Sequence, residues 1–255
     1  MRLLPIVFAA VLFAGPAFAA PEPPDGSPPG IVPAVAMTDR PAAMIALDAS
    51  RKPVEVLKFL GLKRGDRVLD VMAGGGYYSE IIGNAIGSKG HVLAEAELAS
   101  VDTKSAEWAA LVTRVPNVEI LDQAPGDLRL PANSIDFTLM HLVYHDTYWE
   151  SAKDKFARID PALFLKRIYA ATKPGGIVGV VDSIANPGGD TRAVVDKLHR
   201  IDPAVVRADF KAAGFKLEAE SKLLANPADD HTRLVFDPAI RGKTDRLVYR
   251  FRKPL

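Results

Sequence analysis

The stretch that decides the fold is RVLDVMAGGGYYSE, which spans residues 67–80. A β-rich run from Arg67 to Met72 carries an acid, Asp70, near its end, and three glycines follow it. The residues from Tyr78 onward then have the pattern of a helix. Glycines let a backbone approach a ligand, and a helix N-terminus offers unpaired N–H groups. The stretch predicts a strand, a turn that faces a ligand and a helix; a tight turn without a ligand is the alternative.

Asp70 indicates which kind of ligand this turn accepts. A carboxylate at the strand end repels a phosphate, whereas it suits a cation or the hydroxyl groups of a sugar. A dinucleotide-binding turn must be free for a pyrophosphate. The acid therefore distinguishes this turn from a dinucleotide loop.

Helical and β-rich segments alternate along the chain on both sides of this turn. We expect helices at residues 53–60, 78–86, 105–115 and 161–172, and strands at residues 67–72, 91–95, 118–121, 135–142 and 177–182. This alternation is typical of an α/β domain with a mostly parallel, doubly wound sheet. A further helix is expected at 203–213, and strands at 215–224 and 245–252 are expected to form an antiparallel C-terminal pair.

Composition excludes several classes of protein. The 255 residues are 48% hydrophobic and 25% charged, which is an ordinary globular balance with room for one sizeable domain. The 32 Lys and Arg residues nearly equal the 31 Asp and Glu residues, and no dense basic run suggests nucleic-acid binding. The chain has no cysteine, which excludes disulfides, thiolate metal sites and a cysteine nucleophile.

The N-terminus has the pattern of an export signal. A basic start at Arg2 is followed by an apolar run from Leu3 to Phe13 and by Ala17-Phe18-Ala19, a small-x-small cleavage pattern. We expect residues 1–19 to be a cleaved signal peptide, with the periplasm as the destination and no membrane association after cleavage; an uncleaved anchor is the alternative. Residues 20–50 then form a Pro-rich arm, and residues 51–255 form the main domain.

Four segments, in order, resemble motifs of the class I S-adenosylmethionine-dependent methyltransferases. They are GLKRGDRVLDV at 61–71, GHVLAE at 90–95, LPANSID at 130–136 and TKPGGIV at 172–178. The resemblance covers about residues 53–183 and implies a Rossmann-like methyltransferase fold with S-adenosyl-L-methionine as cofactor. The signal peptide, the glycine turn and residues 198–202 are also similar to a secreted bacterial subgroup of predicted methyltransferases.

The resemblance also implies which residues contact the cofactor. The methionine part would lie against Asp70 and the turn formed by Ala73, Gly74, Gly75 and Gly76, although Met72 stands where the family has a glycine. The ribose would be bound by an acid after the second strand, for which Glu95 and Glu97 are both candidates. The adenine contact would follow the third strand, at Asp122, Gln123 or Asp127.

The end of the fourth expected strand carries the most chemistry. Methyl transfer needs an aligned nucleophile, and a base where that nucleophile carries a proton. His145 is the candidate general base, because its ordinary pKa lies near neutral pH. Asp146 would either orient it or face water, and Tyr144, Tyr148 and Trp149 would form walls of a pocket or stack on a flat or cationic ligand. We expect His141 to be a core residue rather than a catalytic one.

Two polar segments are expected at the same edge of the sheet. Asp182 ends the fifth strand, and His199 lies on the segment that crosses toward the tail. Beside His145 they would form a cluster suited to a substrate or to a metal with oxygen and nitrogen ligands. We assign no metal ligands from the sequence.

Three functions are compatible with these features. The first is methyl transfer to a small-molecule acceptor, for which the sequence carries no signature. The second is a non-enzymatic binding module on the same fold, since an exported protein lies away from the cytoplasmic cofactor supply and Met72 departs from the motif. The third is a hydrolase that uses His145 and Asp182, which no Gly-x-Ser-x-Gly elbow supports.

Overall fold

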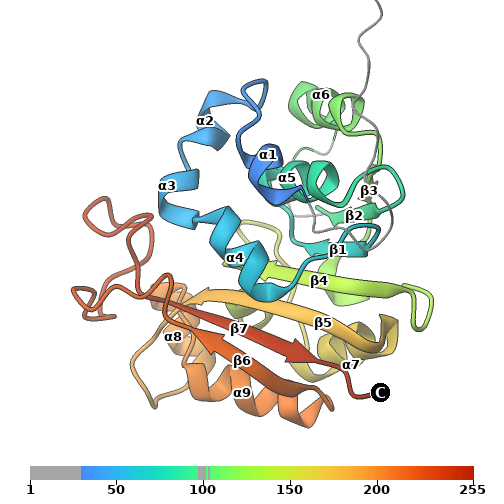
Figure 1. The fold of residues 1–255 in the computed structure, drawn as a ribbon. Helices are drawn as coiled ribbons and strands as arrows, with labels where there is room; N and C mark the ends of the chain where they lie inside the picture. The colour runs from blue at the N-terminus through green and yellow to red at the C-terminus, as the bar shows by residue number, and fades with distance from the viewer. Residues whose placement is uncertain (1–29, 97–101, 103) are drawn as a thin grey trace, which may run out of the picture.

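The computed structural model describes residues 30–96, 102 and 104–255 (Figure 1). Its centre is a seven-stranded sheet in the order β3-β2-β1-β4-β5-β7-β6. The strands are β1 (Arg67–Val71), β2 (His91–Glu95), β3 (Val118–Leu121), β4 (Ile135–His141), β5 (Thr172–Ser183), β6 (Lys216–Ser221) and β7 (Arg246–Arg252). Strands β1 to β5 are parallel, and β7 is antiparallel to both β5 and β6. The predicted α/β fold is confirmed, including the antiparallel C-terminal pair.

Helices cover both faces of this sheet. They are α1 (Ile31–Val35), α2 (Ala42–Ile45), α3 (Asp48–Arg51), α4 (Pro53–Leu60), α5 (Tyr77–Ile86), α6 (Ala106–Arg114), α7 (Pro161–Ala171), α8 (Thr191–Leu198) and α9 (Pro203–Ala212), with 3₁₀ turns η1 (Pro125–Asp127) and η2 (Tyr144–Tyr148). In β1, Val68 belongs to the core beneath α4 and α5, whereas Leu69 belongs to the core beneath α7 and α9. Successive side chains of a strand point to opposite faces, so Val68, Leu69 and Val71 of β1 are all apolar because both faces are covered.

Capping acids explain where the C-terminal helices begin. Asp160 accepts hydrogen bonds from the Ala162 and Leu163 N–H groups, and Pro161 occupies the first turn of α7. Asp202 caps α9 in the same way, by accepting from the Ala204 N–H. These side chains satisfy N–H groups that have no partner inside the helix.

Strand β5 and helix α8 differ from the sequence-based expectation. Strand β5 was expected to begin at residue 177 but begins at Thr172, because Thr172 already pairs with Ile135 of β4. Gly175, at a φ of +77°, lies within this added part of the strand. Helix α8 was not predicted; only Val195 on it is buried, and its residues are polar on average. Asp190 begins this helix by accepting a hydrogen bond from the Ala193 N–H.

The described part of the Pro-rich arm packs against the main domain. Ile31 and Ala34 of α1 are buried, and the Gly30 N–H donates to the Ala85 carbonyl of α5. The predicted signal peptide and residues 20–29 of the arm lie outside the described residues. Across residues 30–96, 102 and 104–255 we find no helix with the length and apolar character that a bilayer crossing requires.

The topology determines where a site can form. The carboxyl ends of β1, β4 and β5 lie at one edge of the sheet, and antiparallel β7 begins at that same edge, where Arg246 pairs with Ser183. Ligands of open α/β sheets bind beyond this edge.

Candidate functional site

The glycine-rich turn leaves β1 with three residues in left-handed conformations. They are Met72, Gly74 and Gly76, with φ values of +48°, +56° and +79°. A Cβ at Gly74 would meet no heavy atom within 4 Å, whereas one at Gly76 would collide with Leu111. Gly75 lies beneath α2, since a Cβ there would be 2.9 Å from Met44 Cε. Gly74 therefore leaves room beside the backbone, and Gly76 permits close packing.

Met72 follows the path of the turn although it is not a glycine. A left-handed residue with a Cβ is disfavoured by about 1 kcal/mol. The Met72 N–H donates to Glu95 Oε2 at 2.9 Å, and the Ala73 N–H donates to the Glu95 carbonyl. Fully buried Glu95 thus ties the turn to the end of β2.

Asp70 is buried beneath the turn. Its Oδ2 accepts a hydrogen bond from Ser79 Oγ at 2.6 Å. Burial raises the pKa of Asp70 to about 6, although the Ser79 hydrogen bond and the charge of Arg51 oppose this shift. The surroundings of Asp70 compensate the negative charge of its carboxylate poorly, so this acid is suited to a cationic ligand.

Two polar atoms beside the turn have no hydrogen-bond partner among the described residues. They are the Tyr78 hydroxyl and His141 Nε2, whose rings are in contact with centroids 4.7 Å apart. Burial holds the pKa of His141 well below its usual range, so this imidazole is neutral. Buried polar groups ordinarily have partners, so this pair is consistent with a polar ligand nearby.

The other predicted cofactor contacts do not belong to the glycine turn. Asp127 lies on η1 with its side chain 74% exposed, 3.7 Å from Arg167. Gln123 Oε1 accepts a hydrogen bond from the Arg129 N–H. Glu97, the alternative to Glu95, lies outside the described residues.

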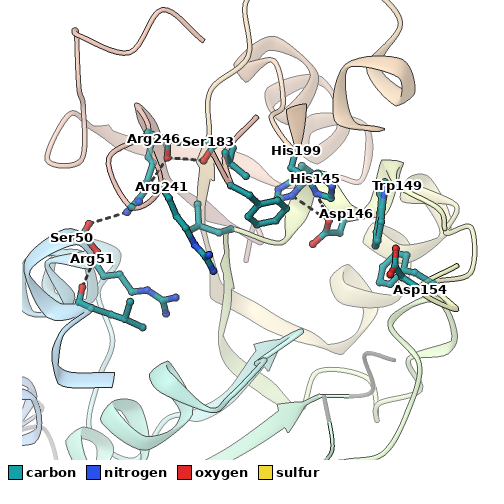
Figure 2. A pocket seen from close by; sticks show the side chains of 17 residues that line it. Ser50, Arg51, His145, Asp146, Trp149, Asp154, Ser183, His199, Arg241 and Arg246 are labelled. Carbon is teal, nitrogen blue, oxygen red and sulfur yellow. Dashed lines mark hydrogen bonds and ion pairs between the residues drawn. The ribbon is translucent and has the colours of Figure 1, made fainter. Parts of the chain in front are cut away.

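A cavity of about 770 Å³ opens beyond the ends of β4 and β5. One end carries His145, Asp146, Trp149 and His199, and the other end carries three arginines, Arg51, Arg241 and Arg246 (Figure 2). None of residues 70–76 lines this cavity in the described part of the chain. It is therefore a compartment beside the turn.

His145 is held between two carboxylates. Its Nδ1 lies 2.8 Å from Asp182 Oδ1, and its Nε2 lies 3.2 Å from Asp146 Oδ1. Burial opposes a charged imidazole, but Asp146 and Asp182 outweigh it and hold the pKa of His145 well above its usual range. The sequence predicted a pKa near neutrality; the two carboxylates instead stabilise the protonated form.

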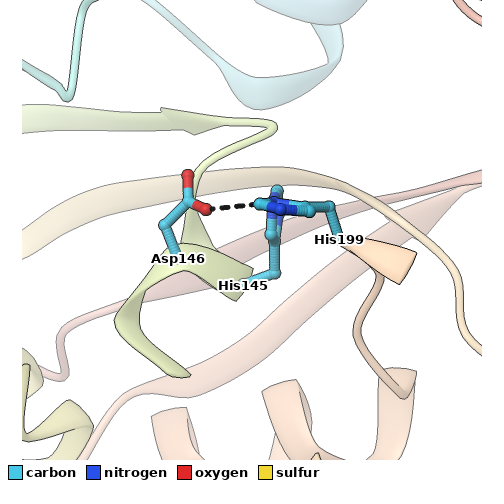
Figure 3. Close-up of side chains that lie close together, drawn as sticks. All are labelled: His145, Asp146 and His199. Atoms are coloured by element: carbon cyan, nitrogen blue, oxygen red, sulfur yellow. Dashed lines mark ion pairs between the residues drawn. The ribbon is translucent and has the colours of Figure 1, made fainter. Parts of the chain in front are cut away.

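His199 joins this cluster from the end of α8. Its Nδ1 lies 3.6 Å from Asp146 Oδ1, and its ring centroid is 5.5 Å from that of His145 (Figure 3). Trp149 and Phe236 cover its ring, with centroids 5.1 and 5.0 Å away. The fold therefore brings together the four predicted residues His145, Asp146, Asp182 and His199, which come from three separate segments.

Tyr144, a predicted pocket wall, lies elsewhere. It packs against Phe210 in the core, and its hydroxyl donates to Asp209 Oδ2 at 2.8 Å. Tyr148 donates to the same oxygen. The 3₁₀ geometry of η2 explains this placement, because it turns Tyr144 toward α9 while His145 faces Asp182.

The arginines of the cavity were not predicted from the sequence. Arg246 is 5% exposed; its Nη1 donates to the Ser50 carbonyl and its Nε to Thr244 Oγ1. Burial and the charge of Arg51 lower its pKa. Neither Arg241 nor Arg246 forms an ion pair with a carboxylate among the described residues. For Arg246, the available signal was a charged residue at the start of an expected strand, directly before the apolar pair Leu247-Val248.

No protein-family model matches the sequence, and a search of curated proteins gave no match. Solved structures do match. A SAM dependent methyltransferase from Aquifex aeolicus is 22% identical over 83% of this chain and 97% of its own, with a TM-score of 0.56. A second match is a 1,6-didemethyltoxoflavin-N1-methyltransferase from Burkholderia thailandensis with bound S-adenosylhomocysteine. It is 19% identical over 86% of this chain and 80% of its own, with a TM-score of 0.51.

A third similar structure is the [4+2]-cyclase SpnF, 19% identical over 81% of each chain with a TM-score of 0.53. At these identities the comparisons describe architecture, and the same architecture is shared by a protein named as a cyclase. This chain therefore has the Rossmann-like fold of the S-adenosylmethionine-dependent methyltransferases.

Proposed function

We propose that this protein binds S-adenosylmethionine at the glycine turn and methylates a small molecule held in the adjoining cavity. One observation carries the proposal: a left-handed turn with open space at Gly74 lies over buried Asp70, at the sheet edge where the cavity opens. The likeness to methyltransferase structures supports it.

The residues at the turn fit this cofactor. Asp70 suits the ammonium group of its methionine part, and Arg51, whose charge acts on Asp70, suits the carboxylate. The Tyr78 hydroxyl and His141 Nε2 supply polar atoms in need of partners. When bound, S-adenosylmethionine supplies a methyl group activated by its sulfonium.

The cavity residues would orient the acceptor. Arg241 and Arg246 favour a molecule with a carboxylate or phosphate, because the described residues give them no acidic partner of their own. Trp149 and Phe236 line the same space and suit a flat apolar body. The acceptor class that follows is a small anionic, partly aromatic molecule.

His145 is our proposed general base. It lies at the opposite end of the cavity from the arginines, where the reacting hydroxyl or amine of such an acceptor would be placed. Since Asp146 and Asp182 favour the protonated imidazole, proton transfer requires either alkaline pH or a group that displaces the resident proton.

A binding module without catalysis is the second candidate. It is favoured by the lining of the cavity, which lacks the turn residues, and by Met72 at the glycine position. In that case a ligand occupies the cavity and the turn stays empty.

We further propose that residues 1–19 direct export to the periplasm and are then removed. The basic start, apolar run and Ala17-Phe18-Ala19 pattern support this. N-terminal sequencing of protein recovered from the periplasm tests it: a first residue of Ala20 is expected, and a first residue of Met1 contradicts cleavage.

Calorimetric titration of the purified protein with S-adenosylmethionine and S-adenosylhomocysteine tests the main proposal. We expect micromolar binding that Asp70→Asn abolishes. Asp66→Asn is a matched control, since Asp66 precedes β1 at the opposite edge and its pKa is also raised to about 6 by burial. No binding by folded protein would leave the binding module as the better account.

A further inference from the structure

We infer that His145, Asp146 and His199 form a binding site for a divalent transition-metal ion of the zinc class. The three side chains come from η2 and from the end of α8, and they converge on one point at the wall of the cavity (Figure 3). Their donor atoms are His145 Nε2, Asp146 Oδ1 and His199 Nδ1, all within 4.8 Å of one another.

The two distances from the donors of His145 and His199 to Asp146 Oδ1 match a metal better than they match hydrogen bonds. Asp146 Oδ1 lies 3.2 Å from His145 Nε2 and 3.6 Å from His199 Nδ1. Donors bound at about 2.0 to 2.2 Å around a tetrahedral zinc ion lie about 3.3 to 3.6 Å apart. The longer distance exceeds that of a good N–H···O hydrogen bond, which is at most about 3.2 Å.

Asp182 supplies the support that metal-binding histidines ordinarily have. It is fully buried; its Oδ1 lies 2.8 Å from His145 Nδ1, and its Oδ2 accepts the His145 backbone N–H at 2.9 Å. A carboxylate on one ring nitrogen places the proton there and directs the lone pair of the other nitrogen toward the metal. Here that other nitrogen is Nε2, which faces Asp146.

The charge of the cluster favours a cation. Asp146 and Asp182 are both within ion-pair distance of His145, and among the described residues neither forms an ion pair with lysine or arginine. With both imidazoles neutral, the cluster carries the negative charge of Asp146, which faces the site, and that of Asp182, which lies behind His145. A divalent ion would neutralise them and would replace the proton that His145 and Asp146 share.

The backbone of His199 is held in an unusual conformation. It ends α8 at a φ of +48°, where glycine or asparagine is the common residue. Trp149 and Phe236 hold the ring from two sides. Strained positions of this kind cluster at functional sites, and this one directs the imidazole toward Asp146.

Three protein donors leave the site open to the cavity. A three-donor site of two histidines and one carboxylate keeps at least one position for water or substrate, as catalytic sites do. If the proposed methyl transfer is correct, a cation here would lower the pKa of an acceptor hydroxyl bound beside it and take over the role of a general base. Metal binding itself does not depend on that activity.

The test uses the purified full chain without a histidine tag, stripped with a chelator. Zn²⁺ is titrated by calorimetry, and Co²⁺ by visible absorption, whose intensity reports tetrahedral coordination. We expect one equivalent per chain, with Asp182→Asn weakening binding 10- to 100-fold and His199→Asn weakening it at least as much.

His199→Asn is chosen because asparagine tolerates the left-handed conformation, so the variant should fold. His231→Asn is the matched control; His231 has a φ of +63° and pairs with Asp245 outside this cluster. Binding that is absent, or equally strong in His199→Asn, overturns the inference.

A final pair of measurements separates this inference from the proposed function. Cofactor affinity is measured on metal-free and metal-loaded protein, with no acceptor present. If the cofactor binds but zinc does not, the metal site is wrong and the methyltransferase proposal stands. If zinc binds through His199 but the cofactor does not bind, the metal site stands without methyl transfer.

Discussion

Asp182 holds His145 by both the ring and the backbone, with one carboxylate oxygen 2.8 Å from Nδ1 and the other 2.9 Å from the backbone nitrogen. This double contact joins the end of β5 to η2, so the imidazole cannot rotate away without breaking a buried, charge-assisted hydrogen bond. The side chain that faces the cavity is therefore oriented before any ligand arrives.

Replacing His145 with glutamine should slow turnover without preventing cofactor binding. A general base contributes roughly 100- to 10,000-fold to rate, while His145 does not belong to the glycine turn. We expect that loss in kcat with less than a threefold change in the Kd for S-adenosylmethionine. A loss in kcat below threefold would remove His145 from the proton-transfer step.

Asp70→Asn should stabilise the protein at neutral pH. The pKa of Asp70 rises from 3.8 to about 6 on folding, so the folded state binds the proton more tightly and stability falls as the pH rises between these values. Asparagine removes this loss, which amounts to about 3 kcal/mol. Urea unfolding at pH 7.5 should show the gain, and unfolding below pH 4 should not. An equal gain at both pH values would contradict the assignment.

The two left-handed glycines should respond differently to alanine. Gly74→Ala places its methyl in open space, so it should cost only about 1 kcal/mol of backbone strain while reducing cofactor affinity. Gly76→Ala drives a methyl into Leu111 and should cost more in stability, since overpacking adds typically 1–3 kcal/mol. Thermal unfolding together with calorimetry distinguishes them. Unchanged cofactor affinity in folded Gly74→Ala would place the ligand elsewhere.

Arg241→Met should raise the KM for anionic acceptors and leave neutral ones unaffected. Its guanidinium lines the cavity without an acidic partner among the described residues, so its charge is available to the acceptor. Screening paired acids and amides with the variant measures this preference. Arg207→Met serves as the control, because Arg207 pairs with Glu220 on the surface. Equal KM changes for acids and amides would exclude the proposed charge recognition.

The sheet could be predicted from the sequence because its signals are local. β-rich runs such as Arg67–Val71 are bounded by turn residues, and acids such as Asp160 cap the helices that follow. Helix α8 escaped prediction because its apolar face consists mainly of Val195. The boundary of β5 shifted because pairing with β4 continues past Gly175.

The site was predictable only in part. His145 follows β4 on η2, and Asp182 lies near the end of the neighbouring parallel strand β5, so topology brings them to one edge. The arginines come from α3, from a long loop and from an antiparallel strand, and their meeting depends on tertiary packing. The raised pKa of His145 likewise depends on a second carboxylate that approaches from β5.

The antiparallel direction of β7 has an evolutionary consequence. It brings the long connection after β6 to the mouth of the cavity, and this connection supplies Phe236, Arg241 and Thr244. The glycine turn and the ends of β1 and β2 lie in the other half of the sheet. Insertions or exchanges in this one loop can therefore change which molecule the cavity accepts without altering the glycine turn.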